Sequence, residues 1–286
     1  MIAVNSYIRP SSIEVALNLM ADDIYRPIAG GTDLIPQLRF ESEARVLDIG
    51  SLNLNFITEY DDTIEIGAAC SHTMVATSPL IAKWAPLVGI ASGMVGSRQI
   101  RNRGTIGGNI VNASPCADTV PALLIYDAEV VLVSRGGHRQ VKLAKFITKP
   151  YATDRKPDEL LKCIICRKDN SSTGHSYLKL GRRQAVNISR MTVSMSMHKD
   201  NNNTIRKVKI SGGSIFPVTS RMPELEKMLE GQTASSKLFE EAGEFAAELM
   251  IKASGQRWST PYKKPVLIGL MKRALRESSG LENGHK

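Results

Sequence analysis

The sequence predicts a mixed α and β protein that is divided into two or three small domains. Strand and helix patterns alternate near the N-terminus, strands recur through the middle of the chain, and the part beyond residue 222 is almost entirely helical. The length of 286 residues is long for one hydrophobic core, and the composition, 42% hydrophobic and 23% charged, is that of an ordinary globular protein. We therefore expect more than one core.

The first predicted domain begins with a helix. Ser11 and Glu14 have the spacing of a capping box, in which the serine is the N-cap residue. Apolar residues at positions 13, 17 and 20 then give the helix one apolar face. A strand at residues 45–49 completes a small α/β unit.

The middle of the chain is predicted to contain short helices and several strands. Ile64 and Ile66 alternate with polar residues, as in a half-buried strand. Ser78 followed by Pro79 is typical of a helix start. The other expected elements are helices at 86–91 and after Asp118 and strands at 129–133 and 160–166, and a polar run at 170–174 predicts a domain boundary.

The C-terminal part is predicted to contain a strand pair followed by helices. Residues 191–197 alternate Met or Val with Ser or Thr, which predicts a strand whose methionines pack in a core. A strand at 205–210 follows, then helices at 223–230 and 236–254 and a last helix that begins at Thr260. The polar residues 279–286 are expected to form a flexible tail.

Charge and cysteine content argue against several classes of protein. The net charge of +9 comes from basic residues spread along the chain without a nucleic-acid-binding motif, so we expect no nucleic acid partner. The chain shows no signal-peptide pattern, and its apolar runs are too short to span a membrane. The four cysteines are too few and too scattered for a disulfide scaffold, which favours a cytoplasmic location.

Cys163 and Cys166 have the C-x-x-C spacing that occurs in metal and redox sites. Two apolar residues lie between them, no second pair accompanies them, and their neighbours indicate a strand. We therefore favour a structural role, with metal or redox use as the alternative.

Two glycine-rich stretches, residues 28–34 and 104–109, are the strongest functional signal. Each combines neighbouring glycines with a threonine, and glycine lets a ligand approach the backbone, where N–H groups can face a phosphate. The second stretch, with three glycines in five residues, is not expected in a helix interior or a regular strand. Together the stretches predict one anionic ligand that is held from two sides.

Other common catalytic patterns are missing from the sequence. There is no G-x-G-x-x-G after a strand, no P-loop, no H-E-x-x-H and no G-x-S-x-G, and the five histidines are scattered. What remains is a pair of glycine- and hydroxyl-rich stretches that suit a diphosphate.

Four motifs in a fixed order resemble the FAD-binding medium subunit of the molybdenum hydroxylases. They are IAGGTDL at 28–34, QIRN at 99–102, GTIGGN at 104–109 and ASPCAD at 113–118, and the similarity extends from about residue 2 to residue 278. The family includes xanthine dehydrogenase, aerobic carbon monoxide dehydrogenase, nicotinate dehydrogenase and aldehyde oxidoreductases. The resemblance implies an α+β fold: a p-cresol-methylhydroxylase-type FAD-binding domain of two α/β subdomains (1–56 and 57–170), then a C-terminal α+β domain (174–278) with a small antiparallel sheet and helices.

The resemblance also implies which residues bind FAD. The backbone of residues 29–33 and the Thr32 hydroxyl would hold the diphosphate from one side, and residues of the second stretch with Asn112 from the other. Asp118 corresponds to an acidic residue near the ribityl and adenosine parts, Leu161 to the cover of the adenine, Lys179 to a cation that reaches the flavin, and Ile188 to a residue near its reactive edge. The complete expected set is Ile28, Ala29, Gly30, Gly31, Thr32, Asp33, Leu34, Thr105, Ile106, Gly107, Gly108, Asn109, Asn112, Asp118, Leu161, Lys179 and Ile188.

Simpler interpretations exist for single members of this set. Asp118 could only cap its helix, Lys179 could be a surface lysine, and Leu161 and Ile188 could be core residues. For the glycines, we expect Gly31→Val or Gly107→Val to abolish FAD binding, because the new side chain would lie against the phosphates.

The function that the resemblance implies is electron transfer. Substrate would be hydroxylated at a molybdenum cofactor in a large subunit. Electrons would pass through two [2Fe-2S] clusters of a small subunit to the FAD of this chain and then to NAD⁺ or another acceptor. The complex would be a dimer of heterotrimers, and this chain would hold no metal, no cluster and no catalytic side chain. A xanthine-dehydrogenase-type enzyme acting on purines is favoured; the alternatives are a carbon monoxide, nicotinate or aldehyde dehydrogenase, a stand-alone FAD oxidoreductase, and a basic binding module without activity.

Overall fold

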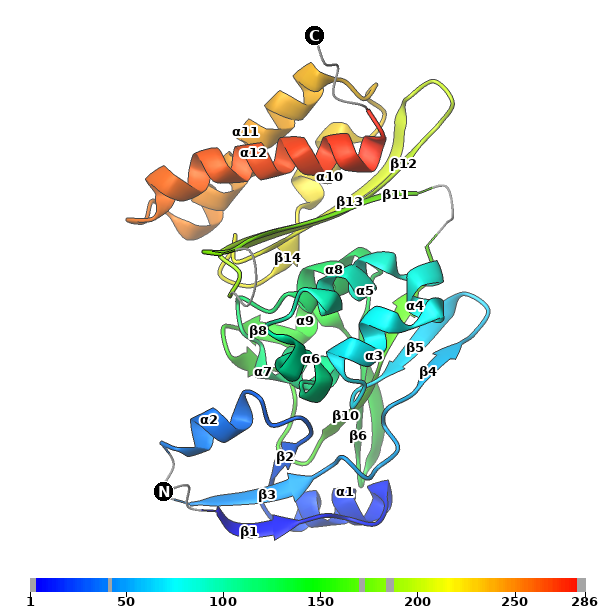
Figure 1. Cartoon of the computed structure of the whole chain (residues 1–286), viewed down its shortest axis with the longest axis vertical. Helices are drawn as coiled ribbons and strands as arrows, with labels where there is room; N and C mark the ends of the chain where they lie inside the picture. Colours follow the sequence, from blue (N-terminus) through cyan, green and yellow to red (C-terminus); the bar gives the residue numbers. More distant parts are fainter. Residues whose placement is uncertain (1–3, 41–42, 170–172, 184–187, 282–286) are drawn as a thin grey trace. The chain divides into compact units, whose positions relative to one another are not determined.

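The computed structural model of the chain describes residues 4–40, 43–169, 173–183 and 188–281. The chain divides into two compact units, the first made of residues 1–114 and 127–168 and the second of residues 115–126 and 169–286 (Figure 1). Helices and strands occur in both units, which confirms the mixed α and β composition. Of the predicted tail at 279–286, residues 282–286 lie outside the described residues, and the last helix continues to Ser279.

A small parallel sheet with the order β1-β3-β2 begins the first unit. Helix α1 buries Ala16 and Met20 in a cluster with Leu47 of β3. Leu38 of helix α2 belongs to a separate cluster with Val46. The elements are β1 (Val4–Ile8), α1 (Ile13–Asp22), β2 (Arg26–Ile28), α2 (Leu34–Leu38) and β3 (Ala44–Asp48).

Helix α1 begins one residue later than the capping-box interpretation predicted. Ser12, not Ser11, is the N-cap residue, and its hydroxyl accepts a hydrogen bond from the backbone N–H of Val15 at 3.3 Å. Ser12 has the extended backbone that a cap requires, with φ −146° and ψ 167°. Two adjacent serines offer the same hydroxyl chemistry, so the sequence pattern alone could not choose between them.

A five-stranded antiparallel sheet with the order β4-β5-β10-β6-β7 forms the rest of the first unit, together with a group of short helices. Its strands are β4 (Ile57–Glu59), β5 (Thr63–Gly67), β6 (Glu129–Ser134), β7 (Gly137–Lys142) and β10 (Leu160–Arg167), and the pair β8 (Ile147–Lys149) and β9 (Ala152–Thr153) forms a separate ribbon. The helices are α3 (His72–Thr77), α4 (Pro79–Trp84), α5 (Pro86–Gly93), α6 (Arg98–Arg103), α7 (Ile106–Asn112) and α9 (Leu143–Phe146). The predicted strands at 129–133 and 160–166 and the helix starts at Pro79 and Pro86 are confirmed.

The second glycine-rich stretch is partly helical, which corrects the expectation of an irregular loop. Thr105 is the N-cap residue of α7, and its hydroxyl accepts from the backbone N–H of Gly108 at 3.1 Å. Gly107 and Gly108 therefore occupy the first turn of a helix. A glycine in that turn costs little when the helix is fixed by its cap and by packing, so glycine content alone was a misleading signal.

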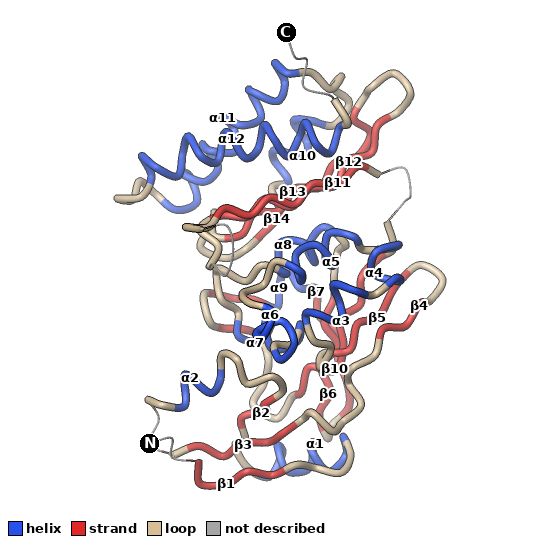
Figure 2. Tube along the Cα trace, in the orientation of Figure 1, coloured by secondary structure: helices blue, strands red, loops and turns tan. Residues whose placement is uncertain are grey.

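The second unit is a four-stranded antiparallel sheet, β11-β12-β13-β14, with helices on both faces (Figure 2). Met191, Met195 and Met197 of β12 lie in the core that the helices of the C-terminal part cover, as predicted for the methionines. Helix α8 contacts β12, β13 and β14. The elements are α8 (Thr119–Ile125), β11 (Gly174–Leu180), β12 (Met191–Lys199), β13 (Ile205–Gly213), β14 (Ser220–Arg221), α10 (Pro223–Leu229), α11 (Ser236–Ser254) and α12 (Thr260–Ser279).

Candidate functional site

A cavity of about 510 Å³ in the first unit is lined by both glycine-rich stretches. It also receives residues from β2, α2, α7 and the start of β10, so the parallel and antiparallel sheets both contribute to its wall. The structure thus brings most of the predicted cofactor-binding residues together. Those that line the cavity are Ile28, Ala29, Gly30, Gly31, Thr32, Asp33, Leu34, Thr105, Gly107, Gly108, Asn109, Asn112 and Leu161.

The two glycine-rich stretches touch each other directly at Gly30. A Cβ atom placed on Gly30 would lie 1.8 Å from the backbone oxygen of Arg103 and 2.9 Å from Cα of Gly104. Such distances are far below van der Waals contact, so only glycine permits this approach. The close approach fixes the position of the first stretch against the residues that precede α7.

The first stretch presents free backbone donors. Among the described residues, the backbone N–H groups of Thr32, Asp33 and Leu34 have no acceptor, and the chain turns at Gly31 with φ +70°. Consecutive N–H groups without a protein partner form a concave donor surface that suits phosphate oxygens. Asp33, which lies in the same turn, has its carboxyl pKa raised by burial.

The second stretch uses its backbone donors inside the protein. The N–H of Ile106 donates to Cys70 O at 3.0 Å, that of Gly107 donates to Ala68 O at 3.0 Å, and that of Gly108 donates to the Thr105 hydroxyl. The expectation that N–H groups of this stretch face a phosphate is therefore wrong for these three residues. These three N–H groups are not available to a ligand.

The packing of α7 already requires glycine at position 107. A Cβ atom there would lie 2.6 Å from Cβ and 2.6 Å from O of Ala68. At Gly31, a Cβ atom would meet Cδ1 of Ile35 at 2.8 Å, in addition to the left-handed φ. Ile106 is fully buried and does not line the cavity.

Three predicted residues, Asp118, Lys179 and Ile188, belong to the second unit. Lys179 Nζ donates to Asp118 Oδ2 at 2.8 Å, and the Ser189 hydroxyl donates to Oδ1 of the same carboxylate. Both members of the Asp118–Lys179 ion pair are buried, with 8% and 7% of the side chain exposed. Ile188 is 78% exposed, so it is not a core residue, and Lys179 is not a surface lysine.

Asp118 holds the N-cap position of α8 without capping the helix. Its side chain makes no hydrogen bond to the first turn, because the carboxylate is occupied by Lys179 and Ser189. Burial raises the carboxyl pKa, while the hydrogen bonds from Lys179 and Ser189 lower it. The Tyr177 hydroxyl donates to the backbone oxygen of Asp118 at 2.8 Å and thereby ties β11 to the start of α8.

A polar chain that the sequence did not suggest joins β2, α2 and α7 at the cavity. Arg26 Nη2 donates to Gln37 Oε1 at 3.3 Å, and Gln37 Nε2 donates to Asn112 Oδ1 at 3.1 Å. Burial lowers the pKa of Arg26. Arg26 and Gln37 belong to no recognisable motif, and only the tertiary fold brings Gln37 to Asn112.

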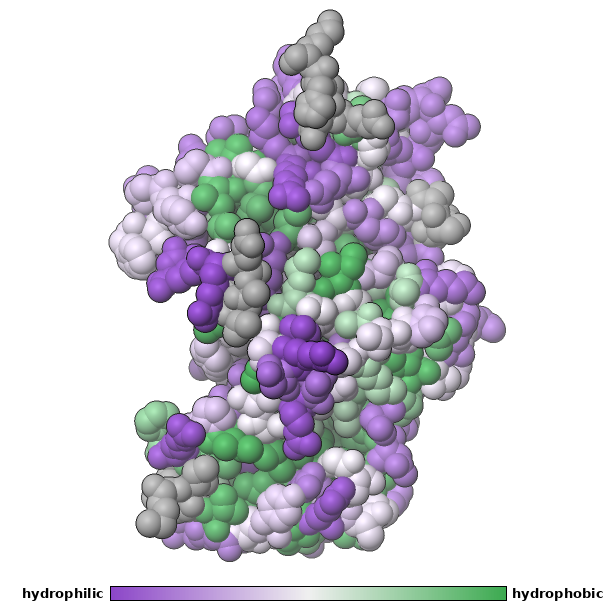
Figure 3. Space-filling view, in the orientation of Figure 1, coloured by the Kyte–Doolittle hydropathy of each residue, from purple (hydrophilic) through white to green (hydrophobic). Residues whose placement is uncertain are grey.

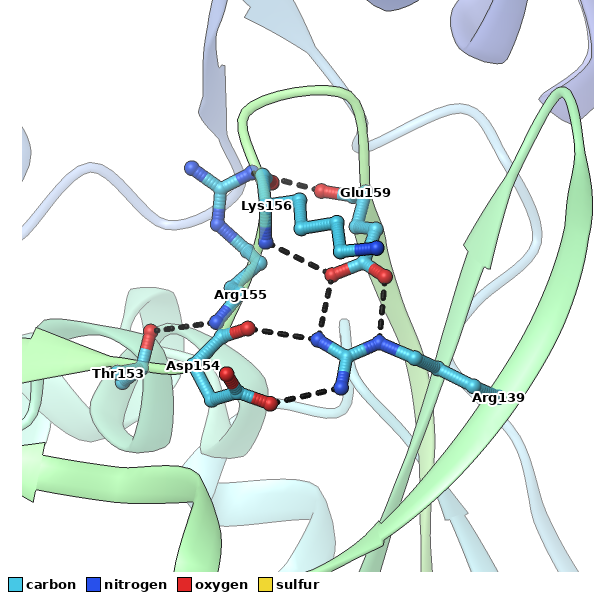
Figure 4. A network of polar contacts seen from close by, with 6 residues as sticks. All are labelled: Arg139, Thr153, Asp154, Arg155, Lys156 and Glu159. Carbon is cyan, nitrogen blue, oxygen red and sulfur yellow. Dashed lines mark hydrogen bonds and ion pairs between the residues drawn. The ribbon is translucent and has the colours of Figure 1, made fainter.

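A second network holds the loop that leads into β10 (Figure 4). The guanidinium of Arg139 in β7 donates to both carboxylate oxygens of Glu159, at 2.6 and 2.9 Å, and to Asp154 Oδ2 at 2.7 Å. Arg155 donates to the backbone oxygen of Glu159 at 2.7 Å. These bonds fix the loop immediately before Leu160 and Leu161, and Arg139 lowers the pKa of Glu159.

His72 is a further cavity residue that the sequence did not single out. It is the first residue of α3, is 2% exposed and has its pKa lowered to about 4, chiefly by burial and also by the charge of Arg101. Its Nδ1 is buried and has no hydrogen-bond partner among the described residues. The sequence contained no specific indication of a cavity residue here, because His72 simply follows Ser71, the N-cap residue of α3.

The cysteines of the C-x-x-C pair are free thiols in β10. Burial raises the pKa of Cys163 to about 11 and that of Cys166 to about 12. Within the part of the chain that the structure describes, no group of three His, Cys, Asp or Glu side chains could hold a metal ion.

No helix among the described residues is long and apolar enough to cross a membrane. Figure 3 shows hydrophilic residues spread over the visible face.

Comparison with protein families accounts for both units. Residues 2–166 match the family described as the FAD binding domain in molybdopterin dehydrogenase. Residues 176–278 match the family described as the CO dehydrogenase flavoprotein C-terminal domain.

Individual relatives are similar over nearly the whole chain. The glyceraldehyde dehydrogenase medium chain of Sulfolobus acidocaldarius is 31% identical, covering 95% of this chain and 97% of its own. The nicotinate dehydrogenase FAD-subunit of Eubacterium barkeri is 30% identical over 93% of both chains, and a putative xanthine dehydrogenase FAD-binding subunit of Escherichia coli is 27% identical, with 98% and 97% covered. A solved carbon monoxide dehydrogenase chain from Hydrogenophaga pseudoflava has a TM-score of 0.90 at 25% identity and covers 98% of this chain and 99% of its own.

Proposed function

This chain belongs to the FAD-binding medium subunits of the molybdenum hydroxylases, and on that premise we propose that it transfers electrons in a xanthine-dehydrogenase-type complex with NAD⁺ as the final acceptor. It is an oxidoreductase subunit whose cofactor is FAD, and in its family the molybdenum and iron–sulfur centres belong to partner subunits. The proposal adds the purine substrate, the acceptor, a cytoplasmic location and assembly as a dimer of heterotrimers. The four free cysteines support a reducing compartment.

The first unit fits the FAD diphosphate. The observation that carries this assignment is the set of backbone N–H groups at Thr32, Asp33 and Leu34, which have no acceptor among the described residues and line the cavity. Thr32 adds a hydroxyl beside them. Donors that are fixed by the fold need no rearrangement when they bind an anion, which favours tight binding.

The remaining roles that we propose concern orientation. Leu161, which lines the cavity at the start of β10, would cover the adenine, and the Arg139–Glu159 network keeps that strand end in place. In the second unit, Lys179 and Asp118 would face the flavin and ribityl parts, with Ile188 near the ring edge. When bound, FAD supplies the two-electron redox chemistry that no side chain of this set provides.

Two experiments test the proposal at different levels. The purified chain should take up FAD at one equivalent and become yellow; a chain that remains colourless and binds no FAD would refute the assignment of the cavity. The complex assembled with its partner subunits should reduce NAD⁺ when a purine is added. Reduction with glyceraldehyde but not with xanthine would instead support aldehyde oxidation, the second candidate, which the 31% identity to a glyceraldehyde dehydrogenase medium chain favours.

A further inference from the structure

His72 is fixed at the place where the two glycine-rich stretches meet. Its backbone N–H donates to Gly104 O at 3.0 Å, and Ser71 pairs with Thr105 in an isolated β-bridge. A Cβ atom built on Gly104 would lie 3.2 Å from the Thr32 hydroxyl and 3.3 Å from His72 Cδ2. The imidazole and the Thr32 hydroxyl therefore both lie close to the same backbone position at the cavity.

The described residues around the His72 ring leave one of its nitrogen atoms without a hydrogen bond. Nδ1 is enclosed without a hydrogen-bond partner among the described residues, although the great majority of buried polar atoms in folded proteins have one. Arg101 Nη1 donates to the backbone oxygens of Val95 and Gly96, at 3.0 and 3.2 Å. His72 lines the cavity, and its ring keeps hydrogen-bonding capacity that the described residues do not meet.

The charges around the ring favour an anion as its ligand. Helices α4, α5 and α6 contact α3. Their titratable side chains are Lys83, Arg98, Arg101 and Arg103, all of them cationic, whereas α5 contributes none. Arg101 is the charge that acts on His72, whereas the carboxylates that line the cavity are those of Asp33 and Glu159. The helices packed against α3 therefore carry only positive titratable groups, although none of these four side chains lines the cavity itself.

We propose that His72 is a further binding residue for the diphosphate of FAD, to which its imidazole donates a hydrogen bond. The N–H groups of Ile106, Gly107 and Gly108 in the second stretch are used within the protein, so the imidazole would add a donor on this side of the cavity. This inference rests on the proposed function, since it concerns the same cavity. A neutral imidazole has one N–H to donate, and an anion close to the ring favours its protonated form.

The test uses the full-length chain without bound flavin and measures the affinity for FAD, ADP and riboflavin. His72→Leu should weaken the binding of FAD and of ADP by roughly tenfold to a hundredfold, because it removes a hydrogen bond to a charged group. Riboflavin, which has no phosphate, should bind with unchanged affinity. His72→Gln, which keeps an N–H donor, should recover part of the loss, and His138→Gln at an exposed position of strand β7 is the matched control.

A second measurement on the wild-type chain does not depend on any variant folding. NMR titration of the histidines should show the pKa of His72 rising from about 4 when FAD or ADP is added, but not when riboflavin is added. If the wild-type chain binds FAD while His72→Leu binds it equally well, or if ADP leaves the His72 pKa unchanged, the role of His72 is refuted. If the wild-type chain binds no FAD at all, the proposed function fails as well.

Discussion

Replacing Gly30 by alanine tests the contact on which the cavity depends. The new Cβ atom would lie 1.8 Å from Arg103 O, about 1.6 Å short of the 3.4 Å at which ordinary contact begins. Arg103 O is a backbone atom and the position of an alanine Cβ is fixed by its own backbone, so no side-chain rotation relieves the clash and the two glycine-rich stretches must separate. Overpacking of this kind costs about 1–3 kcal/mol of folding stability, and we expect the upper part of that range.

FAD affinity should fall together with stability. The free donors at Thr32, Asp33 and Leu34 lie only two to four residues after Gly30, so a displacement of Gly30 moves them away from the position of the phosphate. Loss of one charge-assisted hydrogen bond costs about 1.5–3 kcal/mol of binding free energy, which raises the dissociation constant for FAD by roughly tenfold to a hundredfold. Urea unfolding of the flavin-free chain measures the change in folding stability, and quenching of flavin fluorescence measures the change in FAD affinity.

The matched control is Gly269→Ala in the interior of helix α12. A Cβ atom there meets nothing within 4 Å, and the residue has ordinary helical backbone. This variant should be more stable than wild type by about 0.5–1 kcal/mol and should bind FAD normally. If Gly30→Ala matched wild type in both stability and FAD affinity, the close approach of the two stretches, and the cavity built on it, would be incorrect.

Three further predictions concern buried charges and thiols. Lys179→Met should destabilise the chain by about 3 kcal/mol at pH 7 because it leaves the buried Asp118 carboxylate without its cation. Burial raises the pKa of Asp118, so the loss of stability should become smaller as the pH falls and Asp118 is protonated. Adding Asp118→Asn to the Lys179→Met chain should restore stability. Glu159→Gln should cost about 1–2 kcal/mol at pH 7, and because Arg139 lowers the Glu159 pKa, the difference from wild type should disappear as the pH falls through that lowered pKa. Iodoacetamide at pH 8 should label the half-buried Cys116 first. The other three thiols are buried and have pKa values of about 11 to 12, so mass spectrometry should find them unlabelled until urea unfolds the chain. Early labelling of Cys166 would contradict its burial.

Local patterns in the sequence predicted the elements that local physics controls. The alternation of residues 191–197 identified β12 and the burial of its methionines, because alternate strand residues point to opposite faces. Ser78 and Pro79 located the start of α4, since a cap hydroxyl and a fixed φ act within a single turn. Where two residues offered the same chemistry, as Ser11 and Ser12 did, the pattern was off by one position.

The motifs also predicted the cofactor and much of its cavity, because contiguous stretches supply the backbone donors and the close contact. They did not reveal that α7 uses its first N–H groups inside the protein, since the acceptors Ala68 and Cys70 come from a segment more than thirty residues earlier. His72 and Gln37 stayed hidden for the same reason: each acquires its place from packing between distant elements.

What the sequence determined by itself is the family, the cofactor and many of the strands and helices, all of which depend on short runs of residues whose spacing is set by covalent geometry. The tertiary structure alone decided which groups at the cavity remain free and which are already paired. It did so at Gly30, whose missing Cβ admits Arg103, and at Asp118, whose carboxylate turns from its helix to Lys179. Hydrogen bonds and steric contacts between residues far apart in the chain are satisfied only once the chain has folded, and so no local pattern records them.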